Sequence, residues 1–277
     1  MTRNQLVFKT TVTVLVVAVF CFLPVVLFWK FSCRDSPLSK KPAGKMGPCG
    51  PLAFTRLRLP VTGLASFPGS GNTLLRSLIQ ESTGILTGSE YLDQELATSG
   101  FHGEGATVHH NGSHVILIKT HGSDAGTRER YDRLILLVRH PKGAILSDFN
   151  RVYGGGHLGR ATGDQFKYWP EFFQLHLTAW GSFHRDWLTF NKSTLVVFYD
   201  DLISDPVVHL RKALNFLRVN VSESRLACAI DQSLRYRRSR SRRQTQLYSP
   251  ADQQKLDGVY KNITQEISQR FCFSGSL

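Results

Sequence analysis

A turn of small residues, PGSGNT, stands between an apolar run of strand character at residues 61–67 and a helical pattern whose apolar members are Leu74, Leu75, Leu78 and Ile79. The backbone N–H groups of such a turn converge, and the helix start adds unpaired amides and its positive dipole end. The pattern therefore predicts a cradle for a phosphate-like anion. Its residues are Pro68, Gly69, Ser70, Gly71, Asn72 and Thr73, and we refer to them as the cradle. The residue before Thr73 is not Lys, so the NTPase form of this loop is not expected.

A second apolar run, residues 114–120, ends with a cation and a titratable ring. Side chains alternate along a strand, so Lys119 and His121 project to one side and Thr120 to the other. Open α/β sheets bind ligands at the carboxyl ends of their strands. We therefore predict that Lys119 supplies positive charge and that His121 acts as a base, although a histidine taken singly is more often a surface or hydrogen-bonded residue.

A third apolar run, residues 133–138, is followed by Arg139. Pro141 then opens a helix, and Ser147 lies on that helix eight residues beyond Arg139. A guanidinium and a hydroxyl group near a helix start predict a second anion site. A structural ion pair is the alternative role for Arg139.

The rest of the chain continues the alternation of strands and helices. A fourth apolar run covers residues 193–199, and helical patterns cover residues 141–152, 171–190, 201–217, 223–232 and 250–267. Strands that are apolar throughout and alternate with helices indicate a parallel sheet covered on both faces. We therefore predict an α/β fold of the P-loop-like, three-layer kind, with a central parallel sheet flanked by helices and one preceding transmembrane helix.

The N-terminal part predicts a membrane anchor. Residues 10–29 carry no charge and are long enough to span a bilayer as one helix. A cleaved signal peptide would have a shorter apolar core and small residues at its cleavage site. We predict a cytoplasmic tail at residues 1–9, a signal-anchor helix at residues 10–29, a stem at residues 30–60 and one domain at residues 61–277. Basic residues are more numerous after the span than before it, which argues weakly for the opposite orientation.

Glycosylation sequons and cysteines favour a lumenal domain. Four sequons follow the predicted span, at Asn111, Asn191, Asn220 and Asn262. The cysteines outside the span are even in number, which suits an oxidising compartment: Cys33, Cys49, Cys228 and Cys272. Three pairings of these cysteines are open at this point.

The chain is strongly basic, with a formal net charge of +13 and a pI near 9.8. Such a balance suggests an anionic partner, such as an anionic cofactor, an acidic glycan, nucleic acid or an anionic membrane face. Six of the nine residues at 235–243 are Arg. This run fits a solvated segment about as well as a surface that attracts an acidic acceptor, and its end at Arg243 resembles a proprotein-convertase cleavage site.

Taken in order, these segments resemble a known family over residues 61–250. PGSGNT after a strand, KTH at a strand end, VRHPKGAILSDFNR, and VVFYDDLISDPVVHLRKALNFL are similar to the cofactor-binding framework of sulfotransferases that use 3′-phosphoadenosine 5′-phosphosulfate (PAPS). ASFPGSGNTLLRSLIQESTGILTGSEYLD and FNRVYGGGHLG resemble, more specifically, the sulfotransferase domain of the WSC-domain-containing membrane proteins. That group is associated with sulfation of sialic acid. The stem is too short to hold the WSC modules themselves.

The resemblance implies a role for each candidate residue. The cradle would hold the 5′-phosphosulfate, Arg139 and Ser147 would hold the 3′-phosphate, and His121 would be the catalytic base. A further 3′-phosphate contact falls on Arg237, Arg238 and Ser239, although the family's next residue, Gly, is Arg240 here. The reaction needs no metal, and no His and Cys cluster in the sequence has the spacing of metal ligands.

The chain departs from the family at two positions, with Gly69 where relatives carry Lys or Arg and Leu74 where they carry Trp. We therefore expect PAPS binding with slow transfer, because a preorganised cation is missing. Replacing Gly69 by Arg is expected to raise the rate, provided that Gly69 does not need a positive φ angle. If His121 is not the base, the nearest acidic candidates in sequence are Glu81, Glu90 and Asp93.

These observations together predict a type II Golgi membrane sulfotransferase. It would move a sulfuryl group from PAPS to a hydroxyl group of a glycan, with sialic acid as the acceptor that the resemblance suggests, and it would need neither metal nor nucleic acid. One alternative is a catalytically silent relative that binds a glycan or PAPS. A P-loop kinase is the other, and the absent Walker Lys disfavours it.

Overall fold

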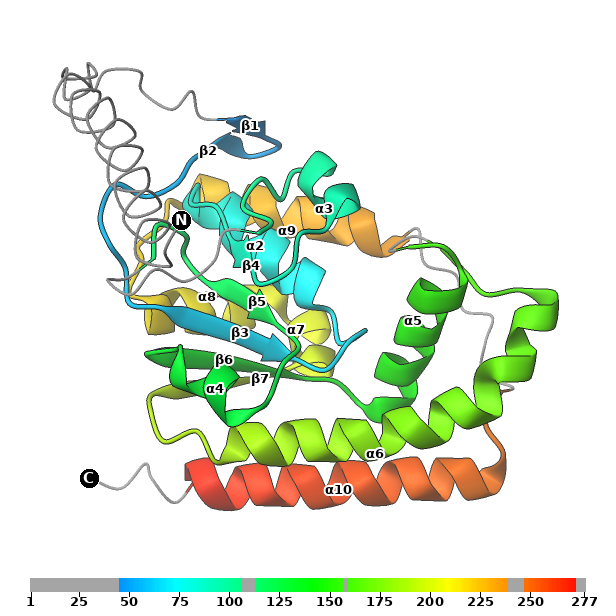
Figure 1. The fold of residues 1–277 in the computed structure, drawn as a ribbon. Coiled ribbons are helices and arrows are strands. Elements are labelled where there is room, and N and C mark those ends of the chain that lie inside the picture. Colours follow the sequence, from blue (N-terminus) through cyan, green and yellow to red (C-terminus); the bar gives the residue numbers. More distant parts are fainter. Residues whose placement is uncertain (1–44, 106–112, 157–158, 239–246, 273–277) are drawn as a thin grey trace, which may run out of the picture. The chain divides into compact units, whose positions relative to one another are not determined.

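A computed structural model describes residues 45–105, 113–156, 159–238 and 247–272 (Figure 1). Within these ranges, no helix combines the length and the apolar character that crossing a bilayer requires. The predicted signal anchor at residues 10–29 lies outside them and stays a prediction.

Five parallel strands form the central sheet, in the order β4-β5-β3-β6-β7. Their bounds are Gly88–Ser89 for β4, Ile118–Thr120 for β5, Thr62–Ser66 for β3, Arg133–Val138 for β6 and Thr194–Phe198 for β7. The central strand β3 pairs with β5 on one side and with β6 on the other. The α/β prediction with a parallel sheet is confirmed.

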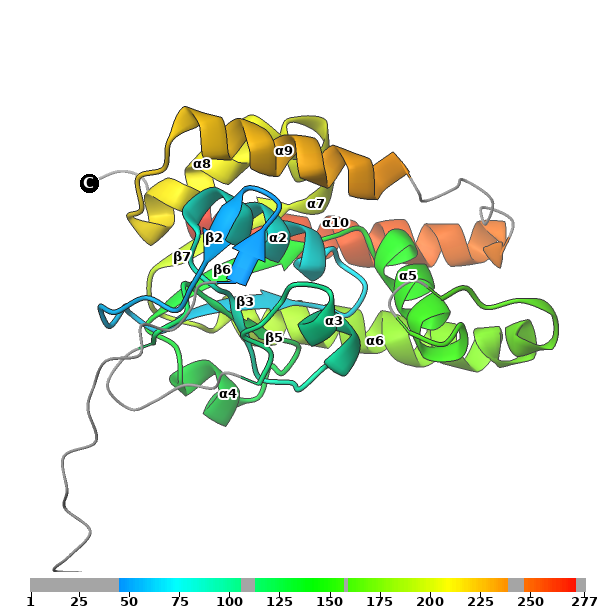
Figure 2. The same ribbon diagram turned by 90° about the horizontal axis from the view of Figure 1, so that it is seen from above.

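Helices cover both faces of this sheet because its strands are apolar on both sides (Figures 1 and 2). Leu64 of β3 faces one layer, which contains helices α2 (Asn72–Thr83), α8 (Pro206–Leu217) and α9 (Glu223–Arg238). The next residue, Ala65, faces the other layer, which contains α5 (Pro141–Tyr153), α6 (Trp169–Leu188) and α10 (Pro250–Cys272). This arrangement brings the carboxyl ends of β3, β5, β6 and β7 to one edge of the sheet.

Several elements differ from the predicted boundaries. The apolar run at residues 114–120 forms a strand only at Ile118–Thr120. The single helix predicted at residues 201–217 is two, α7 (Tyr199–Ser204) and α8, because the Asp205 carboxylate caps α8 by accepting the Val208 N–H at 3.1 Å and Pro206 cannot continue the α7 ladder. Three short helices were not predicted: α3 (Gln94–Thr98), α4 (Ala125–Glu129) and the 3-10 helix η1 (Gly163–Tyr168).

Part of the predicted stem packs on the domain. Strands β1 (Lys45–Gly47) and β2 (Gly50–Leu52) form a hairpin, and a disulfide joins Cys49 in its turn to Cys228 on α9. Leu52 is 2% exposed, and the Ala53 N–H donates to the Gly84 carbonyl at 3.0 Å. The folded unit therefore starts before residue 61, in a Gly- and Pro-rich stretch without apolar periodicity. Of the other two cysteines, Cys33 and the side chain of Cys272 lie outside the described part.

Candidate functional site

The cradle connects β3 to α2 through two glycines with positive φ, Gly69 at 76° and Gly71 at 96°. Gly71 is the N-cap of α2 and offers no side chain to its first amides, and the first turn of the helix contains no acidic residue. The unpaired N–H groups at the start of α2 therefore favour an anion. The Ser70 hydroxyl oxygen is buried, and it has no hydrogen-bond partner in the described part of the chain.

Asn72 ties the cradle to the sheet. Its side-chain amide donates to the Leu64 carbonyl at 3.3 Å and to the Ser66 hydroxyl at 3.1 Å, and the residue is 5% exposed. The Asn72 side chain thus holds the loop against β3, so its predicted share in anion binding falls to the backbone N–H.

Gly69 lies against helix α5. A Cβ atom built on it would be 2.2 Å from the Ala144 carbonyl oxygen and 2.9 Å from the Asp148 nitrogen, both backbone atoms. The positive φ of 76° adds strain for any L side chain. The condition that we attached to the Gly69→Arg substitution is therefore not met, so the expectation that Arg at this position raises the rate no longer applies.

Arg139 and Ser147 meet at Gly69. The Arg139 guanidinium donates to the Gly69 carbonyl at 2.7 Å, and the Ser147 Cβ lies 3.1 Å from the position that a Cβ on Gly69 would take. Both residues are half-buried. The structure thus brings together the cradle and the predicted second anion site.

Tyr199 is a member of this site that the sequence did not single out. The Arg139 guanidinium carbon lies 4.3 Å from the centre of its ring, and a Cβ on Gly71 would be 2.5 Å from the ring edge. Tyr199 follows β7 directly, as Arg139 follows β6. That position at a strand end was the signal that could have found it.

Lys119 and His121 lie at the end of β5. The His121 Nδ1 lies 2.7 Å from the Ser66 carbonyl oxygen, a contact in which Nδ1–H donates, so the lone pair of the neutral ring is on Nε2. Lys119 is 5% exposed, and burial, with the nearby Arg76 charge second, lowers its pKa from 10.5 to about 8. Both side chains contact Tyr91.

The acidic alternatives to His121 are engaged elsewhere. Glu90 accepts hydrogen bonds from the hydroxyl groups of Thr120 and Tyr131. The Asp93 carboxylate accepts the Leu96 N–H as the N-cap of α3, and the Glu81 carboxylate accepts the Cys49 N–H at 3.1 Å. None of these contacts points to a role as the base.

The third predicted phosphate contact is only partly described. The backbone of α9 extends to Arg238 and includes Arg237, which lengthens the helix beyond the predicted end at residue 232. The side chains of Arg237 and Arg238, and the whole of Ser239, lie outside the described residues. This contact stays a prediction.

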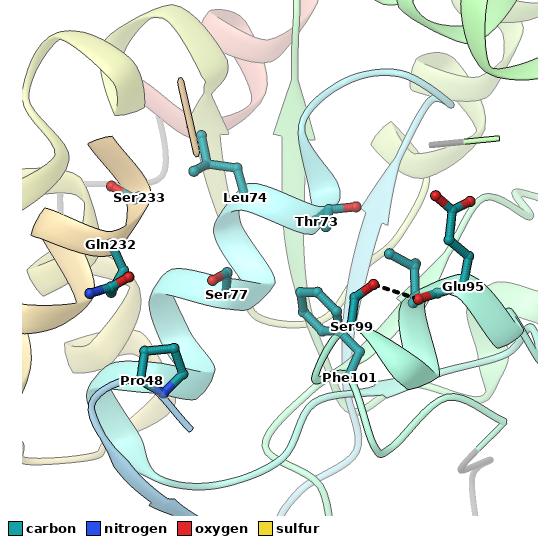
Figure 3. A pocket seen from close by; sticks show the side chains of 10 residues that line it. Pro48, Thr73, Leu74, Ser77, Glu95, Ser99, Phe101, Gln232 and Ser233 are labelled. Atoms are coloured by element: carbon teal, nitrogen blue, oxygen red, sulfur yellow. Dashed lines mark hydrogen bonds between the residues drawn. The ribbon is translucent and has the colours of Figure 1, made fainter. Parts of the chain in front are cut away.

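A pocket of about 220 Å³ lies beside the first turns of α2, next to the cradle (Figure 3). Thr73, Leu74 and Ser77 of α2 form one wall. The other walls come from the hairpin turn at Pro48, the segment around α3, and the α9 residues Gln232 and Ser233. Across the described ranges, no three His, Cys, Asp or Glu side chains are grouped so that they could hold a metal ion.

Comparison with known proteins agrees with the geometry. The family model described as "Sulfotransferase domain" matches residues 63–262. The chain is 42% identical over 204 residues to WSCD family member AAEL009094 of Aedes aegypti, covering 71% of this chain and 63% of that protein. It is 43% identical over 176 residues to WSCD family member CG9164 of Drosophila melanogaster, covering 61% and 54%. The chain thus spans less than two thirds of either relative.

A solved structure shares the fold. The crystal structure of mouse sulfotransferase SULT7A1 complexed with PAP aligns with a TM-score of 0.52 at 17% identity, over 80% of this chain and 91% of that chain.

Proposed function

Because the chain belongs to the sulfotransferase domain family, we propose that it transfers a sulfuryl group from PAPS to a hydroxyl group of a glycan acceptor. The observation that carries this proposal is the convergence of Arg139 and Ser147 on Gly69 of the cradle. Positive charge and a hydroxyl group thereby meet the amide-rich loop at the edge where α/β sheets bind their ligands.

The chain's own residues fit the donor on which the family depends. Gly69 and Gly71 have positive φ, and neighbouring atoms leave no space for a Cβ at either position. Because these two residues carry no side chain, the backbone amides of the cradle can approach the phosphosulfate closely. The buried Ser70 hydroxyl, unpartnered among the described residues, offers one more polar contact. Arg139 and Ser147 would hold the 3′-phosphate, and the pocket beside Thr73 and Leu74 offers space for another part of the nucleotide.

Transfer to an acceptor hydroxyl requires a group that takes its proton. His121 is suited to this role because the Ser66 carbonyl holds the Nδ1 proton and places the lone pair on Nε2. Lys119 would stabilise the negative charge that develops on the oxygens around sulfur. Its side chain is buried and lies two residues before His121, at the same strand end. The reaction forms a bond from the acceptor oxygen to sulfur and breaks the bond from sulfur to the phosphate oxygen, which leaves PAP (3′-phosphoadenosine 5′-phosphate).

The acceptor and the cellular location belong to the same proposal. The net charge of +13 favours an acidic glycan, and the resemblance to the WSC-domain group suggests sialic acid. The asparagines of the three described sequons are exposed: Asn191, Asn220 and Asn262. Together with the Cys49–Cys228 disulfide, they support a type II membrane protein with its catalytic domain in the Golgi lumen. Asn111 lies outside the described residues.

The test is transfer of labelled sulfate from PAPS to an array of glycans, using the full chain in detergent. Labelled product on sialylated glycans, absent with the His121→Ala variant, is the expected result. Binding of PAP without transfer to any glycan would favour a catalytically silent relative. The absence of a cationic side chain at residue 69 is the feature that supports this alternative. Binding of ATP with magnesium in place of PAP would favour the kinase.

A further inference from the structure

Residues Glu90 and Tyr91 continue the pairing of β4 with β5 beyond the last residue of β4. Ser89 is in register with Lys119, and the Glu90 N–H donates to the Lys119 carbonyl at 3.1 Å. Glu90 and Tyr91 therefore run alongside Thr120 and His121. Because side chains alternate in extended chain, the two residues can act on opposite sides of the end of β5.

Glu90 holds one side of this strand end. Its Oε2 accepts the Thr120 hydroxyl at 2.5 Å, its Oε1 accepts the Tyr131 hydroxyl at 2.8 Å, and Arg130 forms an ion pair with Oε1 at 3.0 Å. Burial and the Glu90 carboxylate raise the pKa of Tyr131 far above its ordinary value, so the phenol keeps its proton and remains a donor. Thr120 is fully buried and lies between Lys119 and His121, so fixing it fixes the backbone that carries both.

Tyr91 holds the other side. Its hydroxyl oxygen accepts the backbone N–H of His121 at 3.0 Å, and its ring stacks on the His121 imidazole with 5.5 Å between centroids and 25° between planes. The Lys119 Nζ lies 5.6 Å from the centre of the same ring. One side chain therefore touches both groups to which the proposed function gives chemical roles.

We propose that Glu90 and Tyr91 form a bracket that sets the positions of His121 and Lys119, with Tyr91 as a positioning residue and Glu90 as its anchor. This inference rests on the proposed function for the roles of His121 and Lys119, but the bracket itself is a structural statement. A base and a cation that must reach the same reacting group lose efficiency when either is misplaced by about 1 Å, at a cost of ~10²-fold in rate.

The experiment uses the full chain in detergent with ¹³C,¹⁵N-labelled histidine, so that NMR reports both the ring and the backbone amide of His121. A His121→Gln variant identifies these signals. Tyr91→Phe keeps the stacked ring and removes the hydroxyl acceptor, whereas Tyr91→Ala removes both. Tyr168→Phe and Tyr168→Ala are the matched controls, because Tyr168 is 45% exposed and stacks on Tyr153.

We expect Tyr91→Phe to shift the His121 amide signal and leave its ring signals in place, and Tyr91→Ala to shift both. Sulfate transfer should fall in kcat, by ~10²-fold for Tyr91→Ala and less for Tyr91→Phe, with the KM for the acceptor unchanged. Glu90→Gln replaces one of the two acceptor oxygens by an NH₂ group, which cannot accept a hydrogen bond from Thr120, Tyr131 or Arg130. This variant should also shift the His121 signals and lower kcat.

Unchanged His121 signals in Tyr91→Ala would overturn the proposed bracket. A rise in the KM for the acceptor at unchanged kcat would also overturn it, because Tyr91 would then only contact the acceptor. Should the wild-type chain transfer no sulfate while the His121 signals respond as described, the proposed function fails and the bracket stands. Tyr91 is 39% exposed, so the Tyr91→Ala variant should fold. If this variant does not fold, the shift of the His121 amide signal in Tyr91→Phe tests the bracket.

Discussion

The guanidinium of Arg139 donates to the carbonyl oxygen of Gly69 at 2.7 Å, and this bond joins the end of β6 to the cradle. Gly69 presents this carbonyl to Arg139 while its backbone has a φ of 76°. At that conformation a Cβ would overlap the Ala144 carbonyl oxygen. The conformation of the cradle, the first turns of α5 and the position of the Arg139 guanidinium after β6 are therefore linked through Gly69.

Gly69→Ala should destabilise the protein and abolish PAP binding. Positive φ alone costs ~1–3 kcal/mol for a residue with a Cβ, and the overlap with the Ala144 oxygen adds to this cost. Gly155→Ala is a matched control, because Gly155 has a similar φ of 82° and, among the residues that the structure describes, no heavy atom lies within 4 Å of its Cβ position. Thermal unfolding and PAP calorimetry measure both effects. Equal destabilisation by the two substitutions would show that α5 yields to a side chain at Gly69.

Arg139→Ala should weaken PAP binding by ~10- to 10²-fold, the effect of removing one charge-assisted hydrogen bond to phosphate. Arg139→Lys should recover only part of the affinity, because an ammonium cannot reproduce the planar contact of the guanidinium with the Tyr199 ring. Calorimetry with PAP measures the change. Arg185→Ala is the control: Arg185 is an exposed side chain on α6 that pairs with Glu266 on α10, and this variant should bind PAP normally. Unchanged affinity in Arg139→Ala would contradict the assignment.

His121→Ala should lower sulfate transfer by ~10²- to 10⁴-fold and leave PAP affinity unchanged, because a general base acts on the acceptor and not on either phosphate. The same labelled-sulfate assay and PAP calorimetry test both statements on one preparation. The exposed His114, whose Nδ1 contacts the Thr55 carbonyl at 3.0 Å, supplies the control substitution. Near-normal transfer by His121→Ala would remove the residue from its role.

Much of this site could be predicted from residue types and spacing. The cradle, the common side of Lys119 and His121, and the position of Arg139 at a strand end all follow from local pattern. Tyr91 could not be found in this way, because its contacts arise from the register of β4, a strand of only two residues within a loop-rich region. The sequence also could not show that residue 69 must be glycine, because this requirement comes from backbone atoms of α5 that lie against it as well as from the turn itself. The β1–β2 hairpin has no periodicity to reveal it and is held by Cys49–Cys228.

The Cys49–Cys228 disulfide should add to the stability with which the hairpin is attached to the domain. The two cysteines are 179 residues apart in the sequence. Cys49 follows Pro48 and Cys228 lies one helical turn before Gln232, and both Pro48 and Gln232 line the pocket in Figure 3. Cys49→Ser, Cys228→Ser and the double variant should each lower the free energy of unfolding by about 2–5 kcal/mol. Urea unfolding with and without reductant measures this, and reductant should affect the wild type much more than the variants. A double variant clearly less stable than either single one would mean that the cysteines contribute separately.

Lys119 should make both stability and donor binding depend on pH. Its pKa is lowered from 10.5 to about 8, first by burial and then by the nearby Arg76 charge. Between these values the unfolded chain binds a proton that the folded chain has released, so this residue makes the free energy of unfolding rise with pH from about 8 to 10.5. An anionic ligand favours the ammonium form instead, so affinity for PAP should fall as the pH passes upward through about 8.

Lys119→Met separates this group from the rest of the chain. It should bind PAP more weakly at pH 7 and lose the decline in affinity that the wild type shows between pH 7 and pH 9, because its apolar side chain has no proton to release. Calorimetry over that range measures the decline, and urea unfolding over pH 8 to 10.5 should show a smaller rise in stability for the variant. Lys167→Met, at an exposed position, should keep the wild-type pH dependence of both. If Lys119→Met retains the full decline in PAP affinity, another group titrates in the donor site and the charge assigned to Lys119 must be sought there.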